Sequence, residues 1–328
     1  MKITMAHGSG GNATKELITE LFQKNFSNQI LNQMEDAAVL PGAPKFALTT
    51  DSFVITPLFF PGGDIGKLAV CGTVNDLAMV GATPRYLTSS FIMEEGLDFA
   101  DLEKIVESMK KAAAEAGVDI VAGDTKVVEG KGGVYINTAG VGFLTLENSI
   151  SAQNAAPGDA VILSGTLGNH HACILARRMK IENSIASDCA PLNQIVANLL
   201  KGGVKVKSMR DVTRGGLATV LNEIAESAGV TINIGEEKIP VDQEVQSFCG
   251  ILGLDPLYMA NEGKMICIVP KEDVQKTLEI MHQSKYGEKA ALIGHVADHD
   301  GKKVVLTTKL GGQRLVDILY GEGLPRIC

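Results

Sequence analysis

The sequence lacks both a surplus of positive charge and any long apolar run. Its 328 residues include 30 Lys and Arg against 38 Asp and Glu, which gives a formal net charge of −8. Nucleic acids and anionic membranes are bound through clustered Lys and Arg, so this balance argues against both as partners. No apolar run reaches the roughly 18 residues of a membrane span, and the N-terminus lacks the apolar core of a signal peptide. We therefore expect a cytoplasmic protein.

Cysteine is scarce and scattered. None of the six cysteines forms a CxxC pair, which argues against a zinc signature and against the disulfide framework of a secreted protein. Cys71 and Cys267 lie in apolar runs and are expected to be buried. Cys328 differs because it is the last residue, and Pro325 and nearby glycines disfavour a regular element before it. The sequence predicts either a frayed end or an arm that carries a thiol into a cleft.

What the sequence does contain is an alternation of helix and strand patterns along its whole length. Residues 101–117 show apolar positions at helical spacing and end at a glycine, whereas residues 85–94 alternate as a strand does. A polar, proline-bearing stretch at 154–158 predicts a junction. We expect an α/β (α+β) protein in which each domain is a mixed sheet with flanking helices. The expected parts are a first domain at 1–153, a second at 154–310 and a mobile tail at 311–328.

A glycine-rich turn at residues 7–12 lies between an expected strand at 2–5 and an expected helix at 14–22. Backbone N–H groups in such a turn, together with a helix N-terminus, can cradle a phosphate. The turn is a poor dinucleotide fingerprint, because no second strand ending in an acid follows cleanly. The stretch at 62–68 is not a Walker A motif, since it is one residue short and lacks the Ser or Thr.

Four aspartates of the first half could share one site. Asp51 and Asp124 are expected at the ends of strands, and Asp36 lies in a short acidic stretch. Asp76 lies within an apolar helical segment, where a carboxylate is costly unless it is paired, caps a helix or binds a metal. Carboxylates are the ligands that Mg²⁺ prefers when it bridges to phosphates. The set therefore predicts a Mg²⁺–ATP site, although each aspartate alone could simply cap a turn.

Several stretches spread over the whole chain resemble one family. They resemble the carbamoyl dehydratases of nickel–iron hydrogenase maturation, the HypE family, within the aminoimidazole ribonucleotide synthetase-like superfamily. The glycine loop and the carboxylates are shared across the superfamily, and the terminal PRIC is specific to this member. One departure is that residues 35–36 lack the glycine often seen before them in relatives. The stretches are AHGSGG at 6–11, residues 49–82, AGDTKVV at 122–128, RDVTRGG at 210–216, ANEGK at 260–264 and PRIC at the end.

The resemblance implies a two-domain aminoimidazole ribonucleotide synthetase-like fold, ATP and Mg²⁺ as cofactors, and a homodimer that pairs through its N-terminal domains. It implies ATP-dependent dehydration of S-carbamoylated Cys328 to a thiocyanate, which supplies the cyanide ligand of the hydrogenase iron. A HypF-type carbamoyltransferase would load Cys328, and a HypC–HypD complex that carries the iron would receive the cyano group.

The motif match also implies residue roles. Cys328 carries the reacting group, Glu262 is the preferred general base and His7 is the second choice. A salt bridge with Lys264 is the plain alternative for Glu262. The residues expected to bind ATP are Gly8, Ser9, Gly10, Gly11, Asn75, Lys126 and Arg214, the last either at a phosphate or at the tail. The residues expected to bind metal are Asp36, Asp51, Asp76 and Asp124.

Two other functions stay open from the sequence. Selenophosphate synthetase belongs to the same superfamily, but it would want a Cys or selenocysteine in the glycine loop, where residues 7–12 have neither. A carrier without catalysis could ferry a group on Cys328 and would bind no Mg²⁺–ATP. The adjacent histidines at 170 and 171 are expected to flank a helix start and not to bind metal.

Overall fold

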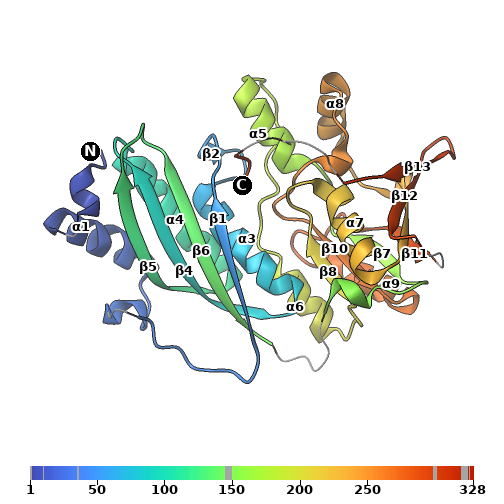
Figure 1. Cartoon of the computed structure of the whole chain (residues 1–328), viewed down its shortest axis with the longest axis horizontal. Coiled ribbons are helices and arrows are strands. Elements are labelled where there is room, and N and C mark those ends of the chain that lie inside the picture. Colours follow the sequence, from blue (N-terminus) through green and yellow to red (C-terminus); the bar gives the residue numbers. More distant parts are fainter. Residues whose placement is uncertain are drawn as a thin grey trace.

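The computed structural model describes residues 2–9, 11–34, 37–144, 150–297, 301–318, 324 and 326–328. It consists of two halves that lie side by side, each a β-sheet with helices packed on it (Figure 1). The end of the chain returns to the boundary between the two halves, close to β2 (Phe59–Phe60). Because three of the candidate residues, Asp51, Asp124 and Lys126, lie on strands, the order of the strands decides whether these three can meet.

The first half is built on a four-stranded sheet of order β1-β6-β4-β5. The pairs β1–β6 and β4–β6 are antiparallel, and β4–β5 is parallel. Helices α3 and α4 pack together and cover one face of the sheet. The expected helix at 101–117 is α4, which carries its buried residues on one stripe and ends at Gly117 in the left-handed conformation. The strands are β1 (Phe46–Phe53), β3 (Gly63–Asp64, paired with β2), β4 (Thr83–Glu94), β5 (Asp119–Val128) and β6 (Val134–Phe143), and the helices are α3 (Ile65–Met79) and α4 (Phe99–Ala116).

Helix α3 is apolar nearly all round because it is buried on all sides. It contacts β1 and β6 of its own half and β8 and α6 of the second half. The Asp64 carboxylate caps its N-terminus and accepts hydrogen bonds from the backbone N–H groups of Gly66 and Lys67. This central position explains how the polar residues of α3 can reach both halves.

The N-terminal segment differs from the expected strand and helix. Ile3 exchanges two backbone hydrogen bonds with Gly96 and Leu97, and the chain then turns into a 3₁₀ helix, Met5–Gly8. A single pair is too little for a strand, so the expected strand at 2–5 is wrong. The expected helix is split into α1 (Asn12–Glu16), a π-helical stretch (Leu17–Gln23) and α2 (Lys24–Phe26).

The second half contains a seven-stranded sheet of order β13-β12-β9-β11-β7-β10-β8. Its central strands β7 and β10 are buried at every position. The strands are β7 (Ala160–Leu163), β8 (Ser208–Asp211), β9 (Thr231–Gly235), β10 (Met265–Val269), β11 (Ala291–Ala297), β12 (Lys303–Thr307) and β13 (Gln313–Val316). The helices are α5 (Asn169–Met179), α6 (Asn193–Lys201), α7 (Gly216–Ala228), α8 (Gln243–Leu252) and α9 (Val274–Gln283). Short 3₁₀ turns lie at Leu31–Gln33, Ala152–Asn154, Glu236–Lys238, Pro256–Tyr258 and Lys271–Asp273.

Three features of this half differ from expectation. The sequence pattern at 204–208 predicts a strand, whereas the strand in the structure, β8, begins at Ser208, and no pattern predicted β9 or α8. Strand β13 pairs with β12 along Val304–Thr307, so it belongs to the sheet although it falls within the tail expected at 311–328. No helix within the described residues is both long and apolar enough to cross a membrane.

Candidate active site between the two domains

The last residues of the chain are docked between the two halves. The backbone N–H of Val54 donates to the Cys328 carbonyl oxygen at 2.9 Å, and that of Thr56 donates to the Arg326 carbonyl oxygen at 3.1 Å. Ile327 forms an antiparallel bridge with Ile55 and is only 3% exposed. Of the two alternatives for the chain end, the structure shows the arm that reaches into the protein and not the frayed terminus.

The second half also holds this docked end. His170, which the sequence placed at a helix start, lies in the first turn of α5, and its Nε2 is 2.7 Å from the Ile327 carbonyl oxygen. Arg178, near the end of the same helix, donates from its guanidinium to the Arg326 carbonyl oxygen, and its Nε donates to the Thr56 carbonyl oxygen at 2.6 Å. Both halves therefore bind the same short stretch of backbone.

The Cys328 thiol lies among charged groups from both halves. Burial, and next the negative charge of Glu262, raise its pKa to about 12, and Arg214 acts in the opposite direction. Asp51 and Asp211 add further negative charge. The docked sulfur is therefore a protonated thiol near neutral pH, and it is a poor nucleophile in this position.

Glu262 is the most unusual of these groups. Its side chain is buried at 3% exposure, and its Oε1 has no hydrogen-bond partner. Burial raises the pKa of this carboxyl group well above its ordinary value, and the nearby Cys189, Asp188 and Asp211 raise it further. A buried carboxyl oxygen without a partner is costly to the fold, which fits a group kept for chemistry.

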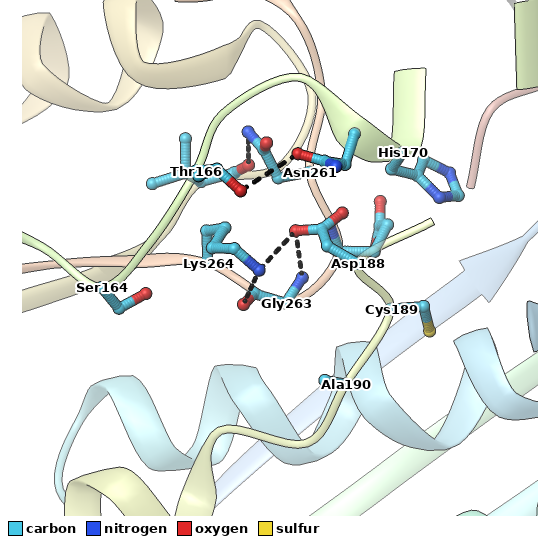
Figure 2. A network of polar contacts seen from close by, with 12 residues as sticks. Ser164, Thr166, His170, Asp188, Cys189, Ala190, Asn261, Gly263 and Lys264 are labelled. Atoms are coloured by element: carbon cyan, nitrogen blue, oxygen red, sulfur yellow. Dashed lines mark hydrogen bonds and ion pairs between the residues drawn. The ribbon is translucent and has the colours of Figure 1, made fainter. Parts of the chain in front are cut away.

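A buried ion pair between Lys264 and Asp188 holds the turn that carries Glu262 (Figure 2). The Asp188 carboxylate accepts hydrogen bonds from the backbone N–H groups of Glu262 and Gly263, both at 3.2 Å. Lys264 forms its ion pair with Asp188 at 3.2 Å. The expected alternative, a salt bridge between Glu262 and Lys264, is therefore not what the structure shows.

Three aspartates lie near the tail. Asp51 and Asp76 are hydrogen-bonded to each other, and burial followed by the Asp76 charge raises the pKa of Asp51 to about 6. Burial also raises the pKa of Asp76, whose Oδ2 accepts a hydrogen bond from Thr49 at 2.9 Å. Burial, followed by the Asp76 charge, raises the pKa of Asp211 to about 7. Such a set of facing carboxyl groups binds protons or cations readily.

The structure brings together two of the four expected metal ligands. Asp51 lies inside β1 and not at its end, and Asp124 likewise lies inside β5. Strands β1 and β5 are opposite edges of the sheet, three strand spacings or roughly 14 Å apart. Asp124 forms an ion pair with Lys126 at 2.7 Å, which lowers the pKa of Asp124. Among the residues that the structure describes, no three potential ligands converge to hold a metal ion, and Asp36 lies outside the described residues.

The glycine loop lies beside β5. A Cβ atom on Gly8 would come within 2.7 Å of the Val127 nitrogen, so this position accepts only glycine without a shift of the backbone. His7 Nδ1 is 3.0 Å from the Thr4 hydroxyl group. Gly8, Ser9, Gly11, Lys126 and His7 thus share the β5 edge, whereas the tail docks beyond the end of β1. Gly10 lies outside the described residues.

Asn75, which was predicted to bind ATP, joins the two halves of the chain. Its side chain is 2% exposed, and its Nδ2 donates to the Ala190 carbonyl oxygen at 3.1 Å. Its Oδ1 accepts from the Leu192 N–H at 2.7 Å. The Asn75 amide thus binds backbone groups of the second half and joins the two halves. Its assignment to ATP binding stays a prediction.

Replacing Asn75 by Ala is expected to lower the free energy of unfolding by about 1–3 kcal/mol, because two buried backbone groups lose their partner. Urea unfolding followed by circular dichroism measures this. Asn12, which is exposed on α1, is the control, and Asn12→Ala is expected to change the value by less than about 0.5 kcal/mol. Equal effects of the two substitutions would contradict a joining role for Asn75.

Sequence reasoning missed several residues of this site. Asp211 was not among the predicted site residues, yet it lies close enough to Asp76 and Asp51 for their charges to raise its pKa. Asp188 and Cys189 lie in an irregular stretch before α6 that showed no pattern. The RDVTRGG motif held a signal for Asp211, whereas nothing local marks Asp188.

The fold and the site define a class. Residues 34–144 match the family model of the AIR synthase related protein, N-terminal domain, and residues 156–307 match that of its C-terminal domain. The chain is therefore a two-domain AIR synthase related protein.

Within that class the chain belongs to the carbamoyl dehydratase HypE family. It is 50% identical to the carbamoyl dehydratase HypE of Cupriavidus necator over 333 residues, covering 100% of this chain and 95% of that one. A crystal structure of the hydrogenase maturation protein HypE in complex with ATP superposes with a TM-score of 0.95 at 47% identity, covering 99% of each chain. A HypE–HypF complex matches with a TM-score of 0.81 at 50% identity, covering 92% of this chain and 99% of that one.

Proposed function

We propose that this chain uses ATP to dehydrate a carbamoyl group carried on its own Cys328, and that the resulting thiocyanate supplies the cyanide ligand of a nickel–iron hydrogenase. One observation carries the proposal: the docked chain end places the buried Cys328 thiol close to Glu262, whose buried Oε1 has no hydrogen-bond partner. Relatives of nearly full-length similarity bear the name carbamoyl dehydratase, which supports the same reaction.

The chemistry explains why the reacting group needs an enclosed position beside a base. The oxygen of a carboxamide is a poor leaving group. Phosphoryl transfer from ATP to that oxygen makes phosphate the group that departs, and loss of both N–H protons leaves a C≡N bond. The balance is R–S–C(O)NH₂ plus ATP giving R–S–CN, ADP and phosphate. The protein must therefore hold the carboxamide still, exclude water and accept protons.

We assign Glu262 as the general base that accepts a proton from the carboxamide. Its carboxyl oxygen is buried and without a partner, so it is free to bond with an N–H group of the carboxamide. A raised pKa makes the ionised carboxylate a stronger base. Arg214, whose positive charge acts on both Cys328 and Asp51, is positioned to offset negative charge beside the reacting group. His7 remains the second choice for the base. Within one chain it lies beside β5, whereas Cys328 docks beyond the end of β1, so His7 and Cys328 are not neighbours.

The residues present fit Mg²⁺ and ATP. Asp51 and Asp76 are two facing carboxyl groups with raised pKa values, an arrangement that a divalent cation would relieve. We assign metal binding to these two with Asp124 and Asp36. The glycine loop (Gly8, Ser9, Gly10, Gly11) and Lys126 are assigned to the phosphates. Bound Mg²⁺ would neutralise phosphate charge during phosphoryl transfer.

A homodimer would complete this site. The face of the first sheet that α3 and α4 leave open carries exposed apolar side chains, namely Phe46, Leu48, Ile92 and Val128. A two-fold axis running along the strands would set β1 of one chain opposite β5 of the other. That pairing joins Asp51 and Asp76 of one chain with the glycine loop and Lys126 of its partner, which one chain keeps at opposite edges.

The two expected partners act on the tail at different moments. The docked thiol is buried and its pKa is about 12, so it cannot attack a carbamoyl donor from this position. We assign loading to a HypF-type carbamoyltransferase that meets the released tail, in line with the solved HypE–HypF complex. Delivery of the cyano group to a HypC–HypD complex would likewise require release.

Mass spectrometry of the C-terminal peptide tests the proposal. Cleavage after Glu322 releases residues 323–328, and the carbamoylated peptide is expected to lose the mass of one water only when ATP is added to the intact protein. Cys328→Ala serves as the control and is expected to show neither carbamoylation nor water loss. Water loss without ATP would contradict the proposal. Failure to bind Mg²⁺–ATP by calorimetry would favour the carrier without catalysis.

A further inference from the structure

We propose that His170 and Arg178, on the same helix α5, form a clasp that sets the register of the docked tail and so aims Cys328 at the reacting groups. We call these two residues the α5 clasp. They are positioning residues, because they bind the tail backbone and not the reacting atoms. The consequence for catalysis rests on the proposed function, whereas the clasp itself does not.

The three last described carbonyl groups all have donors. The Arg326 oxygen accepts from the Thr56 N–H at 3.1 Å and from the Arg178 guanidinium. The Ile327 oxygen lies 2.7 Å from His170 Nε2, and the Cys328 oxygen accepts from the Val54 N–H at 2.9 Å. Donors alternate between the β1 end and α5, so the backbone is bound from both sides.

The neighbours of His170 settle which ring nitrogen donates. Its Nδ1 is 2.7 Å from the Ser187 hydroxyl oxygen, which already accepts a hydrogen bond from the Cys189 N–H at 3.1 Å. The Ile327 carbonyl oxygen can only accept, so the proton of the neutral ring lies on Nε2, and the Ser187 hydroxyl group donates to Nδ1. The ring is fully buried and packs edge-on against Phe60 at 5.4 Å, so it has no freedom to turn away.

Register is the property that these contacts control. The tail is paired with residues 54–56 as a very short antiparallel strand. A slip by one residue would move Cys328 by roughly 3.3 Å and turn its side chain to the opposite face. One bridge between Ile55 and Ile327 is too little to forbid such a slip. The α5 clasp forbids it, because its two donors fit two successive carbonyl groups, those of Arg326 and Ile327.

The clasp also joins docking to the arrangement of the two halves. Val54 and Thr56 belong to the first half and α5 to the second, and Arg178 bonds to Thr56 as well as to the tail. A change in the angle between the halves would separate the two sets of donors. The clasp binds backbone groups, and among residues 324 and 326–328 Ile327 is the side chain that is fully buried.

Alkylation of Cys328 by iodoacetamide, measured on the peptide 323–328 of the intact protein, tests the clasp without ATP or a carbamoyl donor. Arg178→Met is expected to raise the alkylation rate roughly tenfold, because a hydrogen bond to a charged donor is lost. Arg178→Lys keeps one donor and is expected to give a smaller rise. Arg177→Met removes the same charge from the neighbouring exposed position and is expected to stay within about twofold.

His170 gives a second, independent arm. His170→Leu removes the donor and is expected to raise the rate about three- to tenfold, whereas His170→Gln restores an amide donor near Nε2 and is expected to bring it back towards the parent value. Equal rates for Arg178→Met, Arg177→Met and the parent protein would overturn the clasp. Loss of the water-elimination reaction in the parent protein, with these alkylation differences intact, would overturn the proposed function and leave the clasp standing.

Discussion

Glu262→Gln is expected to slow the ATP-dependent loss of water from the carbamoylated tail by about 10²- to 10⁴-fold, the range that a positioned general base contributes. The amide has the shape of the carboxyl group, so it preserves packing while it removes the proton acceptor. Single-turnover mass spectrometry of the peptide 323–328 measures the rate. The parent rate is expected to rise with pH as Glu262 ionises, and the variant rate is expected to lose that dependence.

Two further measurements separate a base from a structural group. Glu226→Gln, on the exposed face of α7, is the matched control and is expected to keep the parent rate. The raised pKa of Glu262 means that the folded state favours its neutral form. That contribution is complete below the ordinary value of 4.5 and is lost as pH rises through the folded pKa. The parent protein should therefore lose stability relative to Glu262→Gln as the pH rises above about 4.5. A Glu262→Gln variant as fast as the parent would exclude Glu262 as the base.

Leu48→Lys is expected to separate the proposed dimer and to abolish ATP-dependent dehydration at low protein concentration. Leu48 is 68% exposed on the open face of the first sheet. A two-fold interface counts each substitution twice, so a cost of about 1–2 kcal/mol per site raises the dissociation constant roughly 30- to 700-fold. Sedimentation velocity measures the oligomeric state, and calorimetry measures ATP binding on the same samples.

Ile251→Lys provides the control for this experiment. Ile251 is 82% exposed on α8 of the second half, away from the open sheet face. The same change there is expected to leave both the dimer and the activity intact. A Leu48→Lys protein that is monomeric but fully active would contradict a site shared between two chains, because Asp51 and Lys126 would then have to act from opposite edges of one sheet.

Local patterns predicted much of the fold. The apolar stripe of α4 and its terminal Gly117, and the buried run of β10, are visible within a few residues of sequence. The pairing of Asp76 was also readable, because a carboxylate inside an apolar helix must meet another polar group. In the structure that group is Asp51.

Long-range order could not be read in the same way. The separation of Asp124 from Asp51 follows from the strand order β1-β6-β4-β5, which no local pattern contains. Asn75 donates a hydrogen bond to Ala190, 115 positions away, so no local pattern could predict that Asn75 joins the two halves. The N-terminal strand failed because one bonded pair at Ile3 gives way at once to a 3₁₀ turn.

Strand β13 anchors the chain to the second sheet and ends at Val316, ten residues before the docked Arg326. Enzyme and substrate are therefore one molecule, and the reacting group is presented at an effective concentration on the order of millimolar whatever the protein concentration. The same tether also lets an unloaded Cys328 occupy the docking position between the two halves, just as a carbamoylated Cys328 would. Each chain can thus process one carbamoyl group per loading. The supply of cyano groups is therefore set by the rate at which Cys328 is carbamoylated again, and not by the concentration of a free substrate.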